Sequence, residues 1–573
     1  MKKQILAALA VLAAAGCADD PSGPAAPELS AELLPCVFGK GTRLEVGGTL
    51  TVTGAEAGTL CLQAGSEGAE YTLVPFLADQ DGEARVQVEA IGANLRDPTG
   101  PPNPNVLPGA PALAQPRRDP ELHMRLMERM RGGLTIRPAS AASRSMERVT
   151  PTTAAVVPAV GSFITINIPR FYLDVDPCTA APARQVRVSA VTQRAILVND
   201  PTNPAGGLTD AELRAFGDEF DRQIYPVDVQ NFGAPTDLDD NGGRVIIVFT
   251  REVNALTPPN SGGGYFGGFF APHDLFPRVR TARLDACPRS NVGEIFYLLT
   301  PDPNGAVNGN RFPKDLVLRT AAGTIAHELE HLINSARRIY VNDAEFFEEV
   351  WLDEALAHAA EEINFYAASG LAPRRNLSLA QITADARTSN AVNSYLLDNL
   401  ARYMTYLQAP DSNSVIGPDL LETRGGSWAF LRYAVDRRGT GDQQLFFSLV
   451  NTTRTGLDNL SRVIGAPALD WVQDWTLAVY TDDAVPVEPR FLQPSWNFRD
   501  IMPAVADLYG YDEVFPLKVE RLGSRAAREY NLRGGGAAYL RFGIGGGARV
   551  GLRLTSNDGP PPDSLRFSLV RTR

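Results

Sequence analysis

The stretch Thr324-Ile325-Ala326-His327-Glu328-Leu329-Glu330-His331-Leu332-Ile333-Asn334 contains the pattern His-Glu-x-x-His. Residues four apart on an α-helix lie on one face, so His327 and His331 can direct their imidazoles at the same metal ion. Glu328 follows the first histidine, where a carboxylate can take a proton from a metal-bound water. Apolar side chains recur at helical spacing without a proline, which predicts a half-buried helix. The alternative is a surface helix that carries this pattern by chance.

A second predicted helix supplies a candidate for the third protein ligand that a catalytic zinc site needs. It includes Trp351-Leu352-Asp353-Glu354-Ala355-Leu356, about twenty residues after the histidine pair. This arrangement resembles the gluzincin zinc metallopeptidases. The resemblance implies one catalytic Zn²⁺ held by His327, His331 and Glu354, with Glu328 as the general base. The metzincin pattern needs glycine and histidine at positions that Asn334 and Arg337 occupy here, so that family is excluded.

Within the gluzincins, the chain resembles the hyicolysin-type peptidases over roughly residues 160–490. Besides the two metal helices, three stretches carry this resemblance: Gly263-Gly264-Tyr265-Phe266, SNVGEIFY at 290–297 and RGGSWAFLRY at 424–433. The resemblance implies two lobes with a cleft between them. It also implies that an edge strand of the sheet pairs with an extended peptide substrate.

The residue that stabilises the oxyanion is not supplied by the resemblance. Many gluzincins use a tyrosine or histidine, and the tyrosine expected at the start of the 424–433 stretch is absent. We expect Arg424 to substitute for it, with Tyr395 and Tyr403 as further candidates. His358 lies one turn after Glu354. A second-shell role for His358, simple packing, and zinc ligation in place of Glu354 all stay open.

The N-terminus has the pattern of a bacterial lipoprotein. Residues 1–16 predict an export signal peptide, and Cys17 is the expected site of lipidation. Residues 17–30 predict a flexible tether, and Ala18 after the cysteine favours the outer membrane. We therefore expect an exported protein that contacts the membrane only through its lipid. A plain secretory signal is the alternative.

Cysteine usage agrees with export. Without Cys17, four cysteines remain, and three pairings of them are open. We favour Cys36–Cys61 and Cys178–Cys287, because each pair then lies inside one candidate domain. Structural disulfides are typical of an oxidising compartment.

Composition describes a globular protein. The 573 residues are 44% hydrophobic and 21% charged, a length that suggests about three domains. The net charge is −12 without a long basic run, which argues against a nucleic-acid partner.

The predicted fold class is α+β, a two-lobed gluzincin-type metallopeptidase flanked by N-terminal and C-terminal β-sandwich-like domains. Alternating short strands predict a small β-sandwich at 31–95, and proline-rich chain predicts a linker with one charged helix at 96–158. The metallopeptidase domain is expected at 159–495, with a sheet-containing lobe to about 312 and a helical lobe after it. Residues 496–573 predict a separate C-terminal β domain.

Two further features have competing interpretations. Asp237-Leu238-Asp239-Asp240-Asn241-Gly242 resembles the start of a Ca²⁺ loop, but position twelve is Val248, and a turn before a buried strand explains the same residues. We favour the turn. His273 is expected to pack for structural reasons rather than to contact substrate.

These observations favour a zinc-dependent peptidase, and we expect an endopeptidase that acts on peptide or protein substrates and in which Glu328 activates water. A second hypothesis is a catalytically inactive surface lipoprotein whose metallopeptidase fold serves as a binding module. A third is hydrolysis of something other than protein. Retention of His327, His331, Glu328 and Glu354 together favours the first hypothesis, because a binding module does not need a general base.

Overall fold

The computed structural model describes residues 36, 41–57, 59–91, 95–98, 128–130, 132–138, 157–259, 261, 264–523 and 527–573. It contains both sheets and helices, which confirms the predicted α+β class. The expected signal peptide at 1–16, the lipidation site Cys17, the tether at 17–30 and most of the linker helix lie outside the described residues.

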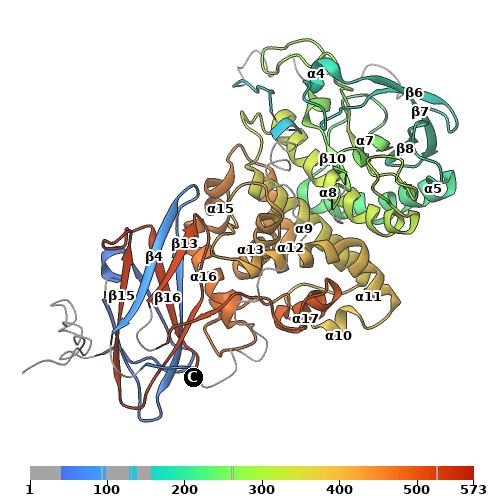
Figure 1. Cartoon of the computed structure of the whole chain (residues 1–573). Helices are drawn as coiled ribbons and strands as arrows, with labels where there is room; N and C mark the ends of the chain where they lie inside the picture. Colours follow the sequence, from blue (N-terminus) through green and yellow to red (C-terminus); the bar gives the residue numbers. More distant parts are fainter. Residues whose placement is uncertain are drawn as a thin grey trace, which may run out of the picture.

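A six-stranded mixed sheet organises the first lobe (Figure 1). Its strand order is β10-β11-β9-β8-β7-β6. The central strands β8, β9 and β11 are parallel, while β10 is antiparallel at one edge. β9 is the wholly apolar segment Val-Ile-Ile-Val-Phe, as expected for a strand covered on both faces. The bounds are β6 Phe163–Asn167, β7 Ala183–Val191, β8 Ala195–Asn199, β9 Val245–Phe249, β10 Gly268–Phe270 and β11 Ile295–Leu298.

Two long helices, one of which packs on this sheet, follow it in the chain. α8 (Lys314–Tyr340) follows Pro313, and α9 (Val350–Ser369) ends at Gly370, whose φ of 78° provides a left-handed cap. The helices pack against each other, and α8 also contacts β10 and β11. Within the described residues, no helix combines the length and apolar composition needed to cross a bilayer.

The second lobe is helical and lies between the sheet and the β-sandwich (Figure 1). α13 (Leu421–Arg438) packs against both α9 and α12 (Leu397–Gln408), which places it beside the second metal helix. The π-helical turn η5 (Val392–Leu396) leads into α12 and contacts α8. The other helices of this lobe are α10 Leu379–Ile382, α11 Ala386–Ala391, α14 Asp442–Val450, α15 Gly456–Ile464, α16 Ala468–Thr481 and α17 Phe498–Leu508.

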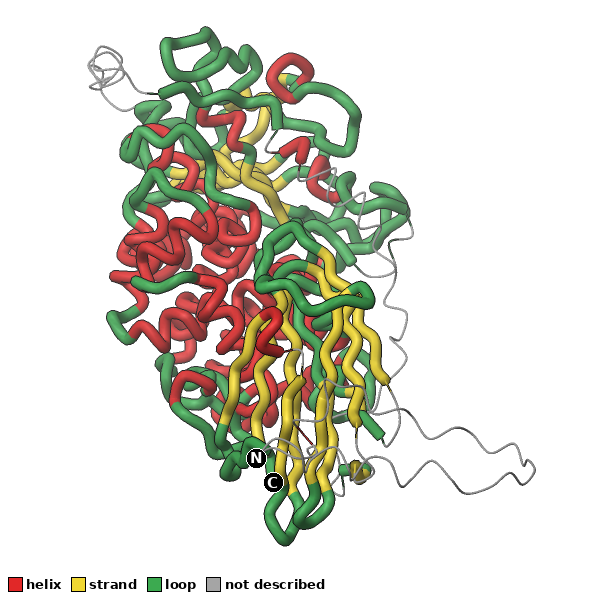
Figure 2. Tube along the Cα trace, turned by 90° about the vertical axis from the view of Figure 1, so that its left-hand side faces the viewer, coloured by secondary structure: helices red, strands yellow, loops and turns green. Residues whose placement is uncertain are grey.

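The prediction of separate N-terminal and C-terminal β domains at 31–95 and 496–573 is wrong. Strands from both ends of the chain interleave in one sandwich, visible as alternating blue and red strands in Figure 1 and as the long strands of Figure 2. One sheet has the order β1-β16-β3-β14-β12, with β5 also paired to β14, and the other has the order β13-β4-β15-β2. The N-terminal strands are β1 Thr49–Thr53, β2 Thr59–Gln63, β3 Ala69–Leu77, β4 Glu83–Ile91 and β5 Leu95–Arg96. The C-terminal strands are β12 Glu520–Arg521, β13 Ala527–Arg533, β14 Leu540–Ile544, β15 Arg549–Ser556 and β16 Leu565–Arg571.

The pairing explains why neither half forms a sandwich alone. Each of β1 to β5 has only C-terminal strands as its ladder partners. Leu73 of β3, for example, lies between Leu540 and Leu569 in the sheet. One apolar core contains buried side chains from both segments, including Val86 and Tyr530. Local alternation predicts strands, but it does not predict which strands pair.

The boundary at 496 is also corrected, because α17 precedes the C-terminal strands. Phe498, Ile501, Met502 and Val505 bury one face of this helix in the core of the helical lobe. After the helical lobe, the chain therefore returns to the sandwich only beyond α17.

Both expected disulfides are present. Cys36 is bonded to Cys61, and Cys178 is bonded to Cys287. The second bond links α4 (Pro177–Ala180) to the loop that precedes β11, on the sheet-containing lobe.

Candidate metal centre

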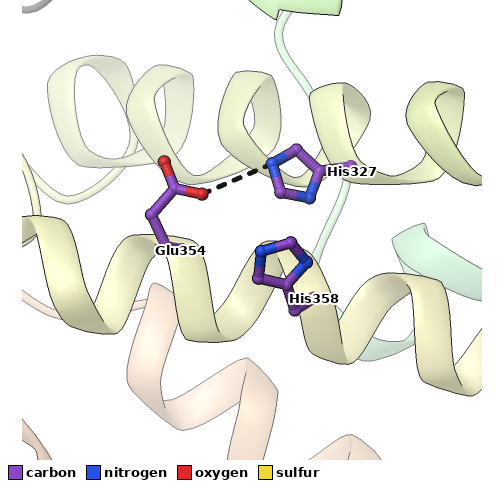
Figure 3. A group of neighbouring side chains, drawn as sticks. All are labelled: His327, Glu354 and His358. Carbon is purple, nitrogen blue, oxygen red and sulfur yellow. Dashed lines mark ion pairs between the residues drawn. The ribbon is translucent and has the colours of Figure 1, made fainter. Parts of the chain in front are cut away.

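The two helices bring His327, His331 and Glu354 together. The Nε2 atoms of the two histidines lie 3.1 Å apart. The Glu354 carboxylate approaches both, with Oε2 at 3.5 Å from His327 Nε2 and Oε1 at 3.7 Å from His331 Nε2. All three side chains are buried. Figure 3 shows His327 of α8 facing Glu354 of α9.

The other nitrogen of each histidine lies against a carboxylate. His327 Nδ1 is 2.8 Å from Glu361 Oε1, and His331 Nδ1 is 3.1 Å from Asp353 Oδ2. Asn334 donates from Nδ2 to the other oxygen of Asp353 at 3.0 Å, which holds that carboxylate in place. Because a carboxylate accepts, the contact with Glu361 favours the proton of His327 on Nδ1, and Asp353 is the carboxylate that faces His331 Nδ1.

This arrangement fits a bound cation. When each imidazole is neutral with its proton on Nδ1, the two Nε2 atoms present lone pairs to each other across 3.1 Å, beside the Glu354 carboxylate. Such a contact is repulsive unless a positive charge lies between the atoms. Two imidazoles and one carboxylate, with carboxylates behind the imidazoles, form the donor set that zinc prefers in catalytic sites.

Electrostatics around His327 also favour a positive charge. Burial lowers its pKa, but hydrogen bonds to Glu354 and Glu361 outweigh burial and raise the pKa to about 10. Burial likewise raises the pKa of Glu354, but Arg424 and the two histidines outweigh it and hold the pKa well below its ordinary value. The centre therefore attracts either a proton or a metal ion at Nε2, and metal binding displaces the proton.

His358 is fully buried beside this group. Its Nδ1 lies 3.0 Å from the same Glu361 oxygen that His327 contacts. Burial lowers the pKa of His358 to about 3, so the imidazole is neutral at physiological pH. His327, Glu354 and His358 each have a ligand atom within 4.8 Å of the others (Figure 3). His358 and His327 therefore contact the same carboxylate oxygen, so His358 affects the position of Glu361 behind His327.

Glu328 lies at the same centre. It is 5% exposed, and burial raises the pKa of its carboxyl group, while the charges of His327 and His331 lower it. A carboxylate with a raised pKa is a stronger base than an ordinary glutamate.

Arg424 approaches the metal centre from α13. Its Nη2 atom lies 3.0 Å from Glu354 Oε1, and its Nε and Nη2 atoms donate to the two oxygens of Asp419. The oxyanion role predicted for Arg424 stays a prediction.

The two tyrosine candidates for the oxyanion have other contacts in the structure, and their catalytic role stays a prediction. The Tyr395 hydroxyl donates to Glu219 Oε1 at 2.7 Å. Tyr403 is buried in an aromatic cluster with Tyr406, Trp428 and Phe498.

No known family model matches the chain. A segment of 156 residues, 27% of this chain, is 33% identical to the neutral metalloprotease ShpI of Staphylococcus hyicus. The match spans 32% of that protein's length. This similarity supports a metallopeptidase family.

Three residues of the candidate metallopeptidase site were missed by sequence reasoning. Asp353 and Glu361 orient the histidines, and Asp419 holds Arg424. Glu361 lies two turns after Glu354 on one helix face, so helical spacing could have found it. Asp419 lies in a loop, where no periodicity predicts its contact.

A second acidic group lies behind His331. Glu330 is fully buried, and burial together with Asp353 and Asp228 raises its pKa well above the ordinary value. Ligand atoms of Glu330, His331 and Asp353 lie within 4.8 Å of one another. Since His331 Nδ1 faces Asp353, this group supports the orientation of His331.

The candidate Ca²⁺ loop forms a hydrogen-bonded turn. Asp237, Asp239 and Glu294 lie close enough to hold an ion. Asn241 donates to Asp239, while Thr236 and the Leu238 N–H donate to Glu294. Burial, followed by the charge of Glu294, raises the pKa of Asp239 to about 7. These hydrogen bonds account for the residues as a turn, so we assign no ion here.

His273 is buried in the 3₁₀ turn η4 (Pro272–Leu275), where its ring lies 6.0 Å from that of Phe171. Burial lowers its pKa to about 4. This placement agrees with the expected structural role.

Proposed function

We propose that the protein is a zinc-dependent peptidase, acting as an endopeptidase on peptide or protein substrates. The observation that carries this proposal is the 3.1 Å approach of two imidazole Nε2 atoms whose Nδ1 atoms both face carboxylates. The similarity to a neutral metalloprotease supports it independently.

His327, His331 and Glu354 would hold the ion, and Glu361 and Asp353 would orient the two imidazoles. When bound, zinc lowers the pKa of a coordinated water to about 7 and polarises the scissile carbonyl. Three protein ligands leave a position for water, which distinguishes a catalytic centre from a structural one.

Glu328 supplies the acid–base chemistry. Its carboxylate takes a proton from the attacking water and later delivers it to the leaving amine. The raised pKa favours this exchange, because a base with a pKa nearer neutrality both accepts and returns the proton readily.

The edge strand β10 is where we place the substrate. Among the described strands, β10 pairs with β11 on one side only. A Cβ on Gly268 of β10 would lie 2.7 Å from Thr324 Cγ2, so this strand runs against α8 one turn before His327. An extended peptide that adds to this edge through main-chain hydrogen bonds would lie beside the metal helix.

The proposal includes export and lipid anchoring at Cys17 to the outer membrane. The N-terminal sequence pattern is the basis for export and lipid anchoring, and the two disulfides agree with an oxidising compartment. Replacing Cys17 by serine should release the protein from the membrane fraction.

The experiment is cleavage of unfolded casein by zinc-loaded protein from which residues 1–17 have been removed. We expect chelator-sensitive cleavage, and a loss of about 10²- to 10⁴-fold in Glu328→Gln at unchanged zinc content. Zinc binding without cleavage of casein or a peptide library would instead identify a binding module. Cleavage that survives Glu328→Gln would remove Glu328 from the mechanism.

A further inference from the structure

Arg424 lies against Oε1 of the candidate ligand Glu354. Its Nη2 atom is 3.0 Å from Oε1, whereas the oxygen nearer to His327 Nε2 is Oε2. The two oxygens of the carboxylate therefore have different environments. Arg424 and Glu354 are 9% and 2% exposed, so water screens this ion pair weakly.

Asp419 fixes the guanidinium from behind. Arg424 Nε lies 2.6 Å from Asp419 Oδ1, and Nη2 lies 3.0 Å from Oδ2. A two-point contact of this kind sets the orientation of the planar guanidinium as well as its position. Lysine has the same charge but cannot form both contacts.

The backbone of α13 beside Arg424 packs closely against α12. A Cβ on Gly425 would lie 2.2 Å from the Arg402 carbonyl carbon of α12, and a Cβ on Gly426 would lie 2.8 Å from the Tyr406 ring. Both positions exclude any larger residue, so α13 approaches α12 backbone to backbone. This contact fixes the position of the Arg424 Cα atom relative to α12.

The β-sandwich holds the loop that carries Asp419. The Arg533 and Ala537 N–H groups donate to the carbonyls of Asp411 and Pro410, and Lys518 Nζ donates to the Asp411 carboxylate at 2.7 Å. The loop 409–420 is thus anchored to residues of the C-terminal segment at Pro410 and Asp411, before it reaches Asp419.

We propose that Arg424, oriented by Asp419, is a positioning residue. Its guanidinium forms an ion pair with Glu354 Oε1, which leaves Oε2 to bind the metal ion. This inference rests on the proposed function, because it takes Glu354 as a ligand. A carboxylate bound through one oxygen leaves more of the coordination sphere open for water and substrate than one bound through two. The pair also explains why an arginine stands where a tyrosine was expected.

The experiment compares metal binding in matched variants of zinc-free protein. Zinc dissociation constants are measured by chelator competition for wild type, Arg424→Gln, Arg424→Lys and Asp419→Asn, with circular dichroism to establish folding. We expect Arg424→Gln and Asp419→Asn to bind zinc about 10- to 100-fold more weakly, the range typical of second-shell changes. Arg424→Lys should keep only part of the zinc affinity that Arg424→Gln loses. The absorption spectrum of the Co²⁺ form should change in all three variants.

Arg432→Lys is the control. Arg432 is a buried arginine on the same helix, paired with Asp436 and Asp442. We expect this variant to unfold at a lower temperature than wild type but to bind zinc equally tightly.

The Glu354→Ala variant distinguishes an error in the proposed ligand set from an error in the positioning role of Arg424. If Glu354→Ala binds zinc as tightly as wild type, the ligand assignment of the proposed function is wrong. If Glu354→Ala weakens binding but folded Arg424→Gln and Asp419→Asn stay within twofold of wild type, the positioning role is overturned. A large loss of kcat at saturating zinc, with unchanged affinity and Co²⁺ spectrum, would overturn it in favour of the oxyanion role.

Discussion

Glu361 Oε1 lies 2.8 Å from His327 Nδ1, on the side of the imidazole opposite the candidate metal position. The same oxygen lies 3.0 Å from His358 Nδ1. Burial raises the pKa of Glu361, but the two histidines outweigh it and lower the pKa below its ordinary value. An ionised Glu361 therefore keeps the proton of His327 on Nδ1 and leaves Nε2 for a metal ion.

Replacing Glu361 by glutamine should weaken zinc binding about 10- to 100-fold, because an amide no longer fixes the tautomer of His327. Chelator competition on zinc-free protein measures this change. Glu362→Gln is the matched control, since the neighbouring carboxylate instead accepts from Trp496 Nε1 at 2.6 Å. Equal zinc affinity in the two variants would contradict the orienting role of Glu361.

Residues 31–98 expressed alone should not fold, because β1 to β5 obtain their ladder partners from the C-terminal strands. Circular dichroism and thermal scanning should show no cooperative unfolding of this fragment. A cooperative transition would indicate an autonomous N-terminal domain and would contradict the interleaved sandwich.

Gly535→Ala should destabilise the contact between the sandwich and the helical lobe. Gly535 has a φ of 75°, and a Cβ there would lie 2.6 Å from Ser414 Oγ and 2.7 Å from Ile416 Cγ1. We expect a loss of about 1–3 kcal/mol in the free energy of unfolding. Gly547→Ala is the control, because Gly547 also has a positive φ but has no atom within 4 Å of the added Cβ. Equal losses in the two variants would show that backbone strain alone, and not this contact, is responsible.

Asp482 should make the fold less stable as the pH rises. Burial, followed by the charge of Asp483, raises the pKa of Asp482 to about 8, whereas an unfolded aspartate titrates near pH 4. Between these values the folded state binds more protons than the unfolded state, so stability falls as pH increases. Asp482→Asn should flatten the fall in the free energy of unfolding between about pH 4 and pH 8. Chemical denaturation of zinc-free protein at several pH values measures this, and an unchanged slope would contradict the buried, protonated state of Asp482.

The part of the site that could be predicted from the sequence depends on local spacing. His327 and His331 share a helix face by periodicity alone, and resemblance to a known motif indicated Glu354. The same periodicity would have found Glu361. Arg424 was singled out, but its contact with Glu354 depends on how α13 packs against α9, which no spacing within one helix predicts.

For the fold as well, the local elements could be predicted from the sequence, but their pairing could not. Strands such as β3 and β4 were expected from alternating apolar residues, and both disulfides were expected from the domain division. The pairing of these strands with others more than 400 residues away could not be predicted, because the pattern of one strand does not identify its neighbour.

The most direct test of the central claim is the zinc content of the purified protein from residue 18 onwards, measured alongside Glu354→Ala after dialysis against a weak chelator. We expect close to one zinc ion per chain in the wild type and a marked loss in the variant, with both proteins folded. A folded wild-type protein without zinc, or a Glu354→Ala variant that retains it fully, would contradict a metal centre formed by His327, His331 and Glu354.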